Sequence, residues 1–335
     1  MNMDGKVRRL LSGRRVRGRI ITRFFNHHRN GKKNDILILA SPRSGSTWLM
    51  EILYTQPGMK YINEPLVKSE LDCFHLLPIN TRWNYLSLEP YEQQILRNYF
   101  QEDKKIKRFG PINIFDPNYN FFTNRRVFKV IRANSLIEWF SEELSLNIIY
   151  LVRHPISQSL SCMNRGHHCE IEEYLNDIQF SKKYLDKKLI DFIREVLQSG
   201  STFEKFITEW CLDNIVPLNT KENYKFLTIT YEEIVMNPEA IIELLYDNLD
   251  LNDKAAMLSK IQTPSMVTDS STKETVDHIK KGDKVFLLDK WRKYISECEE
   301  KIAFEILDRF GIKIYQIGSS LPNKEMLNFR HERGH

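Results

Sequence analysis

Short apolar runs rich in Ile, Val, Leu and Phe recur along the chain, and helix-like stretches separate them. The apolar runs cover residues 36–40, 127–131, 148–152 and 226–230. Because they are apolar at nearly every position rather than at alternate ones, they predict strands buried on both faces, as in parallel sheets. Helices are predicted in the residues after Ser46 and at 91–100, 135–144, 157–163, 185–197, 239–249 and 296–310.

The alternation of strand and helix predicts an α/β fold, in which a doubly wound, mainly parallel sheet carries helices on both faces. Ligands of such sheets bind beyond the carboxyl ends of the strands. The stretch 74–122 mixes Pro, Asn, Tyr and Trp around one helical piece, so we expect an insertion over those strand ends that takes part in acceptor recognition. The predicted organisation is a basic N-terminal tail at 1–33, one catalytic domain at 34–318 and a polar C-terminal tail at 319–335.

The positive charge of the chain is concentrated at its beginning. The net charge is +5, yet residues 1–33 carry eleven Lys and Arg against one Asp, while the remainder has 38 basic and 43 acidic residues. The predicted domain therefore has no overall cationic field, and we expect no nucleic-acid partner. An anionic ligand must be held by a local site.

The basic tail leaves two interpretations open. Residues 6–25 place eight Lys and Arg among apolar residues, several at three- or four-residue spacing, which is typical of an amphipathic helix on an anionic membrane surface. A disordered basic arm is the alternative. No window approaches the ~18–20 apolar residues of a membrane span, and no apolar secretory stretch opens the chain. We expect a cytoplasmic protein, with peripheral membrane contact as an open question.

The five cysteines are odd in number and widely spaced, without a CxxC pair. Neither a disulfide framework nor a zinc site is indicated, and we expect no metal.

Residues 36–48 predict an anion-binding loop, because they run from a buried strand through a tight turn into a helix. Helix N-termini present unpaired N–H groups and the positive end of the helix dipole. Gly45 permits close approach of the backbone, and Arg43 adds a fixed charge. Hydroxyl donors follow at three positions: Ser44, Ser46 and Thr47. An ordinary strand-to-helix connection with a Ser cap is the alternative.

A nucleotide kinase or NTPase is the first competing hypothesis. A Walker loop requires G-x-x-x-x-G-K-[ST], and Ser46 stands in the place of its Lys. Chemistry of the ATP and Mg²⁺ kind is therefore disfavoured.

A second anion site is predicted in residues 147–161, which again read as strand, turn and helix. Arg153 leaves the strand, and Ser161 lies in the helix that follows, so that both side chains can converge on one phosphate. Taken alone, Arg153 is equally well a solvated loop charge.

The run Ser-Pro-Arg-Ser-Gly-Ser-Thr-Trp at 41–48 closely resembles the 5′-phosphosulfate loop of sulfotransferases that use 3′-phosphoadenosine-5′-phosphosulfate (PAPS). The eight-residue spacing from Arg153 to Ser161 resembles the 3′-phosphate motif of the same family. The resemblance implies a P-loop-NTPase-like fold, PAPS as donor without a metal, and transfer of a sulfuryl group to a hydroxyl or amine with release of PAP. Arg43 would neutralise charge on the bridging oxygen as the bond to sulfur breaks.

Weaker matches to the same family lie elsewhere in the chain. Trp48 and Tyr231 resemble aromatic residues that lie beside the adenine, although a core role for Trp48 and a capped helix start at Tyr231 are alternatives. Lys281 and Gly282 resemble a late segment that closes over the 3′-phosphate, and a solvated turn is the alternative there.

The general base distinguishes branches of the family. Members that act on phenols and steroids resemble one another in a Lys-Thr-His segment, but here Lys129 is followed by Val and by Ile131 in the place of the His. Carbohydrate sulfotransferases of the Golgi and their bacterial relatives have Arg in the first loop and Glu-Pro some twenty residues later, which Glu64 and Pro65 match. This resemblance implies Glu64 as the base, and a carbohydrate or glycolipid as acceptor.

The sequence leaves alternatives open for the catalytic residues and for the function. His75 is the reserve candidate for the base, and Lys129 is expected to help neutralise the donor. Glu64 is otherwise a loop carboxylate that caps the next helix. A non-catalytic nucleotide-binding module that has kept the two anion sites is the second competing hypothesis.

Overall fold

A computed structural model describes residues 27–29, 31–66, 84–101, 120–220, 224–263, 265, 277–278, 281–323 and 325. His75 and the tail at 6–25 lie outside the described residues. Of the predicted insertion at 74–122, only 84–101 and 120–122 are described.

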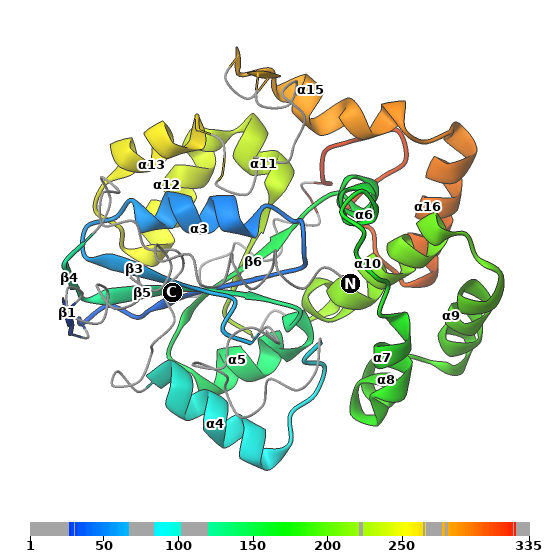
Figure 1. The fold of residues 1–335 in the computed structure, drawn as a ribbon, viewed down its shortest axis with the longest axis horizontal. Helices are drawn as coiled ribbons and strands as arrows, with labels where there is room; N and C mark the ends of the chain where they lie inside the picture. The colour runs from blue at the N-terminus through cyan, green and yellow to red at the C-terminus, as the bar shows by residue number, and fades with distance from the viewer. Residues whose placement is uncertain are drawn as a thin grey trace, which may run out of the picture.

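The centre of the fold is a five-stranded sheet in which every pairing is parallel, with the order β3-β5-β2-β6-β7 (Figure 1). The strands are β2 (Ile36–Ala40), β3 (Met59–Asn63), β5 (Arg125–Ile131), β6 (Asn147–Val152) and β7 (Leu227–Thr230). Four of the five were predicted from their apolar runs. The strand β3 was missed, because its sequence Met-Lys-Tyr-Ile-Asn mixes polar and apolar residues.

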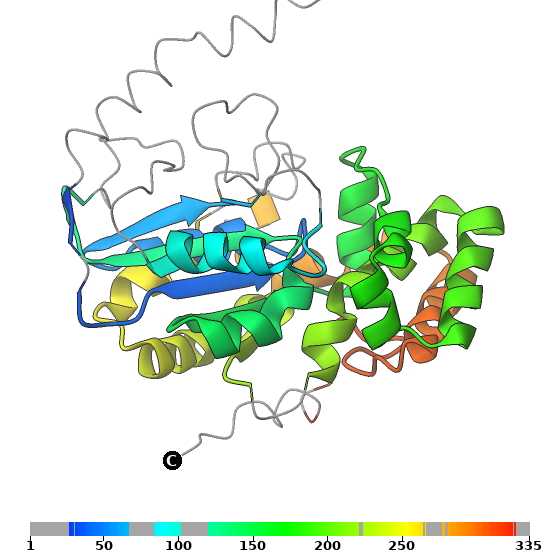
Figure 2. The ribbon, with the colours of Figure 1, turned by 90° about the horizontal axis from the view of Figure 1, so that it is seen from below.

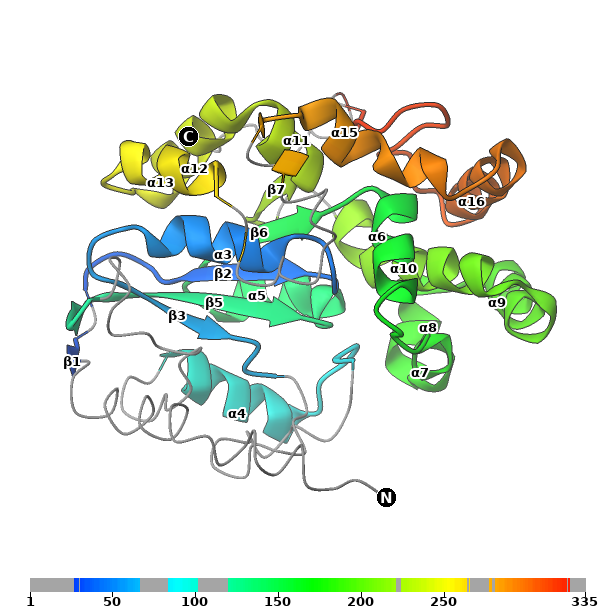
Figure 3. The same ribbon diagram turned by 45° about the horizontal axis from the view of Figure 1, so that its top comes forward.

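Helices cover both faces of this sheet, which confirms the predicted α/β class (Figures 1 and 3). On one face lie α3 (Ser46–Tyr54), α12 (Pro238–Leu249) and α13 (Lys254–Ile261), and on the other α4 (Pro90–Gln101) and α5 (Ile137–Glu143). Side chains alternate across a strand, so Ile36 and Ile38 of β2 enter the first core and Leu37 and Leu39 the second. Both cores consist of buried apolar side chains, which explains why the strands are apolar at nearly every position.

A separate group of helices stands beyond the carboxyl ends of the strands (Figure 2). Its members are α6 (Pro155–Met163), α7 (Ile171–Asn176), α8 (Ile178–Tyr184), α9 (Lys187–Ser199), α10 (Thr202–Asn219) and α16 (Glu297–Arg309). The long helix α10 packs against α6, α7, α9 and α16 and holds the group together. Ser201 and Glu204 form a capping box at its start.

The remaining described elements are short. A 3-10 turn, η1 (Asn134–Leu136), precedes α5, so the helix predicted at 135–144 is divided. α11 (Tyr231–Met236) follows β7 directly, while α15 (Lys284–Asp289) and η3 (Lys290–Lys293) lead to α16. Two-residue strands β1 (His27–His28) and β4 (Phe122–Thr123) pair in parallel.

Two predicted helix starts were displaced by capping chemistry. The helix predicted at 157–163 begins at Pro155, because proline fits the first helical position. The one predicted at 185–197 begins at Lys187, since the Asp186 carboxylate accepts a 2.8 Å bond from the Leu189 N–H and acts as the N-cap. Within the described residues no helix is long and apolar enough to cross a bilayer.

Candidate functional site

The loop between β2 and α3 forms a tight cradle at the carboxyl edge of the sheet. Arg43 and Gly45 adopt left-handed backbone conformations, with φ of 66° and 97°. A Cβ on Gly45 would lie 2.6 Å from the Tyr231 ring, so only glycine fits there. The loop ends where Ser46 begins α3, and the first N–H groups of that helix have no hydrogen-bond partner within the helix. The Ser44 hydroxyl is buried and has no hydrogen-bond partner among the described residues.

The second predicted anion motif meets this cradle. The Arg43 Nε donates to the Ser161 Oγ at 3.0 Å, and the Arg153 Nη1 donates to the Arg43 carbonyl oxygen at 3.0 Å. Burial, followed by the like charges of Arg165 and Arg153, lowers the pKa of Arg43. The Arg153 Nε is buried without a partner in the described part of the chain. A bound anion would satisfy these donors and relieve the repulsion between the guanidinium groups.

An aromatic wall borders the cradle. The Arg153 guanidinium lies 4.4 Å from the centroid of the Tyr231 ring, and the Trp48 ring centroid lies 5.8 Å from that of Tyr231. Burial raises the pKa of Tyr231, so its phenol stays neutral. The predicted adenine-side residues thus lie next to the predicted phosphate residues, and they present flat rings suited to stacking with a base.

The late segment with Lys281 and Gly282 is connected to the helix that begins at Tyr231 through Lys284. Both residues are exposed on the turn before α15. The Lys284 Nζ donates to the Met236 carbonyl oxygen at 2.9 Å, at the end of the helix that Tyr231 begins. The contact of Lys281 and Gly282 with a phosphate stays a prediction.

Glu64, Lys129 and Thr47 form a chain of contacts on the α3 side of the loop. The Lys129 Nζ lies 2.5 Å from the Glu64 Oε1 and donates to the Thr47 Oγ1 at 2.9 Å. The Glu64 N–H donates to the Lys129 carbonyl oxygen at 2.7 Å, which fixes the turn after β3. Lys129 is 4% exposed at its side chain and Glu64 is 25% exposed. One ammonium group therefore links the predicted base to the predicted donor loop.

A buried carboxylate that sequence reasoning did not select holds the Arg153 turn in place. The Glu232 Oε1 accepts from the His154 N–H at 3.0 Å, and its Oε2 accepts from the Tyr315 hydroxyl at 2.8 Å. The Trp210 Nε1 donates to the Arg153 carbonyl oxygen at 3.1 Å. Burial, followed by the charge of Arg292, lowers the pKa of His154 to about 3, so its ring is a neutral packing group.

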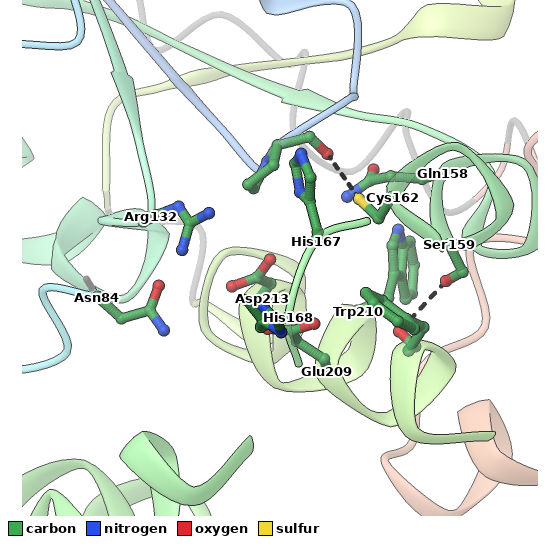
Figure 4. A pocket seen from close by; sticks show the side chains of 12 residues that line it. Asn84, Arg132, Gln158, Ser159, Cys162, His167, His168, Glu209, Trp210 and Asp213 are labelled. Carbon is green, nitrogen blue, oxygen red and sulfur yellow. Dashed lines mark hydrogen bonds between the residues drawn. The ribbon is translucent and has the colours of Figure 1, made fainter. Parts of the chain in front are cut away.

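A pocket lies beside the same loop, between α6 and α10 (Figure 4). Residues from several segments distant in the sequence line it, among them Pro42, Arg132, Gln158, Cys162, Glu209 and Asp213. Burial, together with the neighbouring Asp213 charge, raises the pKa of Glu209 to about 8. Sequence reasoning missed this pocket. Glu209 and Asp213 are spaced as neighbours on one helix face, but α10 itself was not predicted.

The predicted site residues are thus largely gathered at one edge of the sheet, and His75 alone among them lies outside the described residues. Among the residues that the structure describes, no group of three or more His, Cys, Asp or Glu side chains is placed to hold a metal ion.

Comparisons with known proteins identify the family of this chain. The family model of the sulfotransferase domain matches residues 33–302. No curated protein matches the chain. Similar solved structures include the sulfotransferase domain from the curacin biosynthetic pathway, with 19% identity over 84% of this chain and 98% of that one and a TM-score of 0.41. Others are mouse sulfotransferase SULT7A1 complexed with PAP (16% identity, 84% and 85% covered, TM-score 0.39) and the sulfotransferase domain of the Synechococcus PCC 7002 olefin synthase (19%, 87% and 99%, 0.40). With the family model covering well over half of its residues, the chain belongs to the sulfotransferase family.

Proposed function

We propose that this protein transfers the sulfuryl group of PAPS to a hydroxyl or amine of an acceptor, with release of PAP. One observation carries the proposal: the Arg43–Ser161 and Arg153–Arg43 hydrogen bonds bring two phosphate motifs into one cluster. The family assignment supports sulfuryl transfer as the reaction, and mouse SULT7A1, a structure of similar fold, is complexed with PAP.

The donor is proposed to lie along the cradle and the aromatic wall. The buried Ser44 hydroxyl and the Arg153 Nε, both without partners among the described residues, are donors that phosphate oxygens would satisfy. Arg43 and the first N–H groups of α3 add positive potential on the 5′ side. Trp48 and Tyr231 offer the surface for the adenine. When bound, PAPS supplies the sulfuryl group and a stable phosphate leaving group.

Glu64 is proposed as the general base. Its carboxylate contacts Lys129, which also contacts Thr47 of the donor loop, so a proton acceptor lies one side chain away from the cradle. Glu64 would take the proton of the acceptor hydroxyl as the new S–O bond forms. Lys129 and Arg43 would stabilise the negative charge that develops on the leaving phosphate oxygen.

The acceptor is proposed to be a carbohydrate or glycolipid, because the Arg of the first loop and the Glu64-Pro65 pair match the carbohydrate branch. We propose a cytoplasmic location, in which the basic residues 6–25 are either a solvated arm or a peripheral contact to anionic membrane.

The test combines binding and turnover. PAP should raise the melting temperature of the protein in the presence of EDTA. At a PAP concentration of 100 times Kd, binding adds about 2.7 kcal/mol to the free energy of unfolding. Incubation with sulfur-labelled PAPS and a panel of sugars, glycolipids, lipopolysaccharide fragments and phenols should label at least one acceptor. No thermal shift at millimolar PAP, or a shift abolished by EDTA, contradicts the proposal.

A further inference from the structure

The pocket between α6 and α10 adjoins the donor loop directly. Pro42 of the loop lines it, and the Pro42 carbonyl oxygen accepts a 3.8 Å contact from the Cys162 thiol of α6. Arg132, at the end of β5, lines it from the sheet side (Figure 4). Arg43, which donates to Ser161 of α6, directly follows Pro42 in the chain. A molecule in this pocket would lie beside the proposed donor, outside the nucleotide cradle.

Gln158 is the first indication that the pocket receives a ligand. Its side chain is 4% exposed and lines the pocket, yet its Oε1 has no hydrogen-bond partner in the described part of the chain. An unpaired buried carbonyl oxygen is unfavourable, because it has lost its hydrogen bond to water without a replacement. A hydrogen-bond donor on a bound molecule would remove that cost.

Two carboxyl groups of α10 face the same space. Glu209 and Asp213 are one turn apart, and Figure 4 shows their side chains next to each other in the pocket. The Glu209 Oε1 accepts from the Glu170 N–H at 2.9 Å, and the Asp213 Oδ1 accepts from the Tyr174 hydroxyl. A carboxyl group keeps free acceptor positions on its oxygens whether it is ionised or protonated, so each group retains capacity to accept further hydrogen bonds.

The polar lining is close to balanced in charge. Arg132 provides one positive charge against the two acidic groups. Burial and the Asp213 charge raise the pKa of Glu209 to about 8, so this carboxyl is largely protonated at neutral pH. His167 lines the same space, and burial, followed by the charge of Arg132, lowers its pKa, so its ring is neutral. A neutral imidazole can both donate and accept. The pocket therefore presents acceptor oxygens on Gln158, Glu209 and Asp213 beside donor groups such as that of Arg132, without a strong net charge.

We propose that this pocket receives the hydroxyl-bearing edge of the acceptor, and that Gln158, Glu209 and Asp213 select an uncharged, hydroxyl-rich molecule such as a sugar or another polyol. The inference rests on the proposed function and adds the residues that choose the substrate. Several hydroxyl groups would pair with these acceptor oxygens at once. A phenol or steroid has too few donors to do so, and a site built to hydrogen-bond a substrate discriminates strongly against analogues that lack the donors.

Three variants test the pocket: Gln158→Met, Glu209→Gln and Asp213→Asn. Gln158→Met preserves side-chain length and leaves the contacts of α10 untouched, so it separates recognition from folding. Glu195→Gln on the exposed side of α9 is the matched control for loss of a carboxylate. The probes are methyl hexosides and 4-nitrophenol as acceptors, with PAP for the donor site. Saturation-transfer NMR of a methyl hexoside with the PAP complex detects binding without turnover.

We expect the pocket variants to raise the KM for a methyl hexoside by about tenfold or more, the equivalent of one lost hydrogen bond at 1.4 kcal/mol. The KM for PAPS and the thermal shift with PAP should stay at wild-type values, and Glu195→Gln should match wild type throughout. The inference is overturned by an unchanged hexoside KM in Gln158→Met, by preference for 4-nitrophenol, or by no NMR signal from the hexoside. A wild-type protein that fails to bind PAP instead contradicts the proposed function.

Discussion

The Arg43 Nε atom and the Ser161 Oγ atom are 3.0 Å apart, although 118 residues of chain separate them. Arg43 is anchored a second time through its carbonyl oxygen, which accepts from Arg153. A long, flexible Arg side chain loses rotamer entropy when it is ordered. Here that ordering is completed before any ligand arrives, so the guanidinium is preorganised for an anion.

Arg153→Ala is expected to weaken PAP binding by roughly ten- to a hundredfold, the value of one lost charge-assisted hydrogen bond of about 1.5–3 kcal/mol. Isothermal titration with PAP gives the affinity. Arg97→Ala is the control, because Arg97 pairs with Glu143 on the far helices α4 and α5. Equal PAP affinity in the two variants would contradict the placement of Arg153 at a phosphate.

Glu64→Gln should lower turnover by ~10²–10⁴-fold, since the amide cannot take the acceptor proton. The amide oxygen can still accept from Lys129, so PAP affinity should remain close to that of wild type. Single-turnover transfer from labelled PAPS measures the chemical step. Wild-type turnover in this variant would contradict Glu64 as the base and would leave His75 as the candidate.

Gly45→Ala should reduce both stability and PAP affinity more than Gly166→Ala does. Both glycines have positive φ, 97° and 65°, and a Cβ there costs about 1–2 kcal/mol. Only at Gly45 would the new Cβ also collide with the Tyr231 ring, whereas nothing lies within 4 Å of a Cβ at Gly166. Urea unfolding and PAP titration compare the two. Equal losses of stability would show that the loop accommodates the methyl group.

The stability of the wild type should fall with rising pH more steeply than that of Glu209→Gln. Burial and Asp213 raise the pKa of Glu209 from 4.5 to about 8 in the folded state. The folded protein therefore binds the proton more tightly, and this contribution to stability is complete below pH 4.5 and is lost as pH rises through about 8. Urea unfolding at pH 5, 6.5 and 8 measures the difference. Parallel pH profiles, with Glu195→Gln as reference, would count against a buried carboxyl.

Local chemistry explains why the loop after β2 and the turn at Arg153 could be predicted from the sequence. The strand β2, the loop with Arg43 and Gly45, and the start of α3 are contiguous, and their shape follows from an apolar run, a glycine and hydroxyl residues. The Arg153 turn is local in the same way. Two such loops at the carboxyl ends of adjacent parallel strands must lie close together, as β2 and β6 do.

The sequence by itself thus determined the α/β class, four central strands and the two strand–loop–helix turns for which we propose anion binding. Only the tertiary structure decided that β3 joins the sheet, that Glu232 holds the His154 turn, and that Gln158, Glu209 and Asp213 share a pocket with Arg132. Each of these depends on contacts between distant segments. Periodicity and spacing record only near neighbours along the chain, so a pocket assembled from several distant segments leaves no local pattern in the sequence.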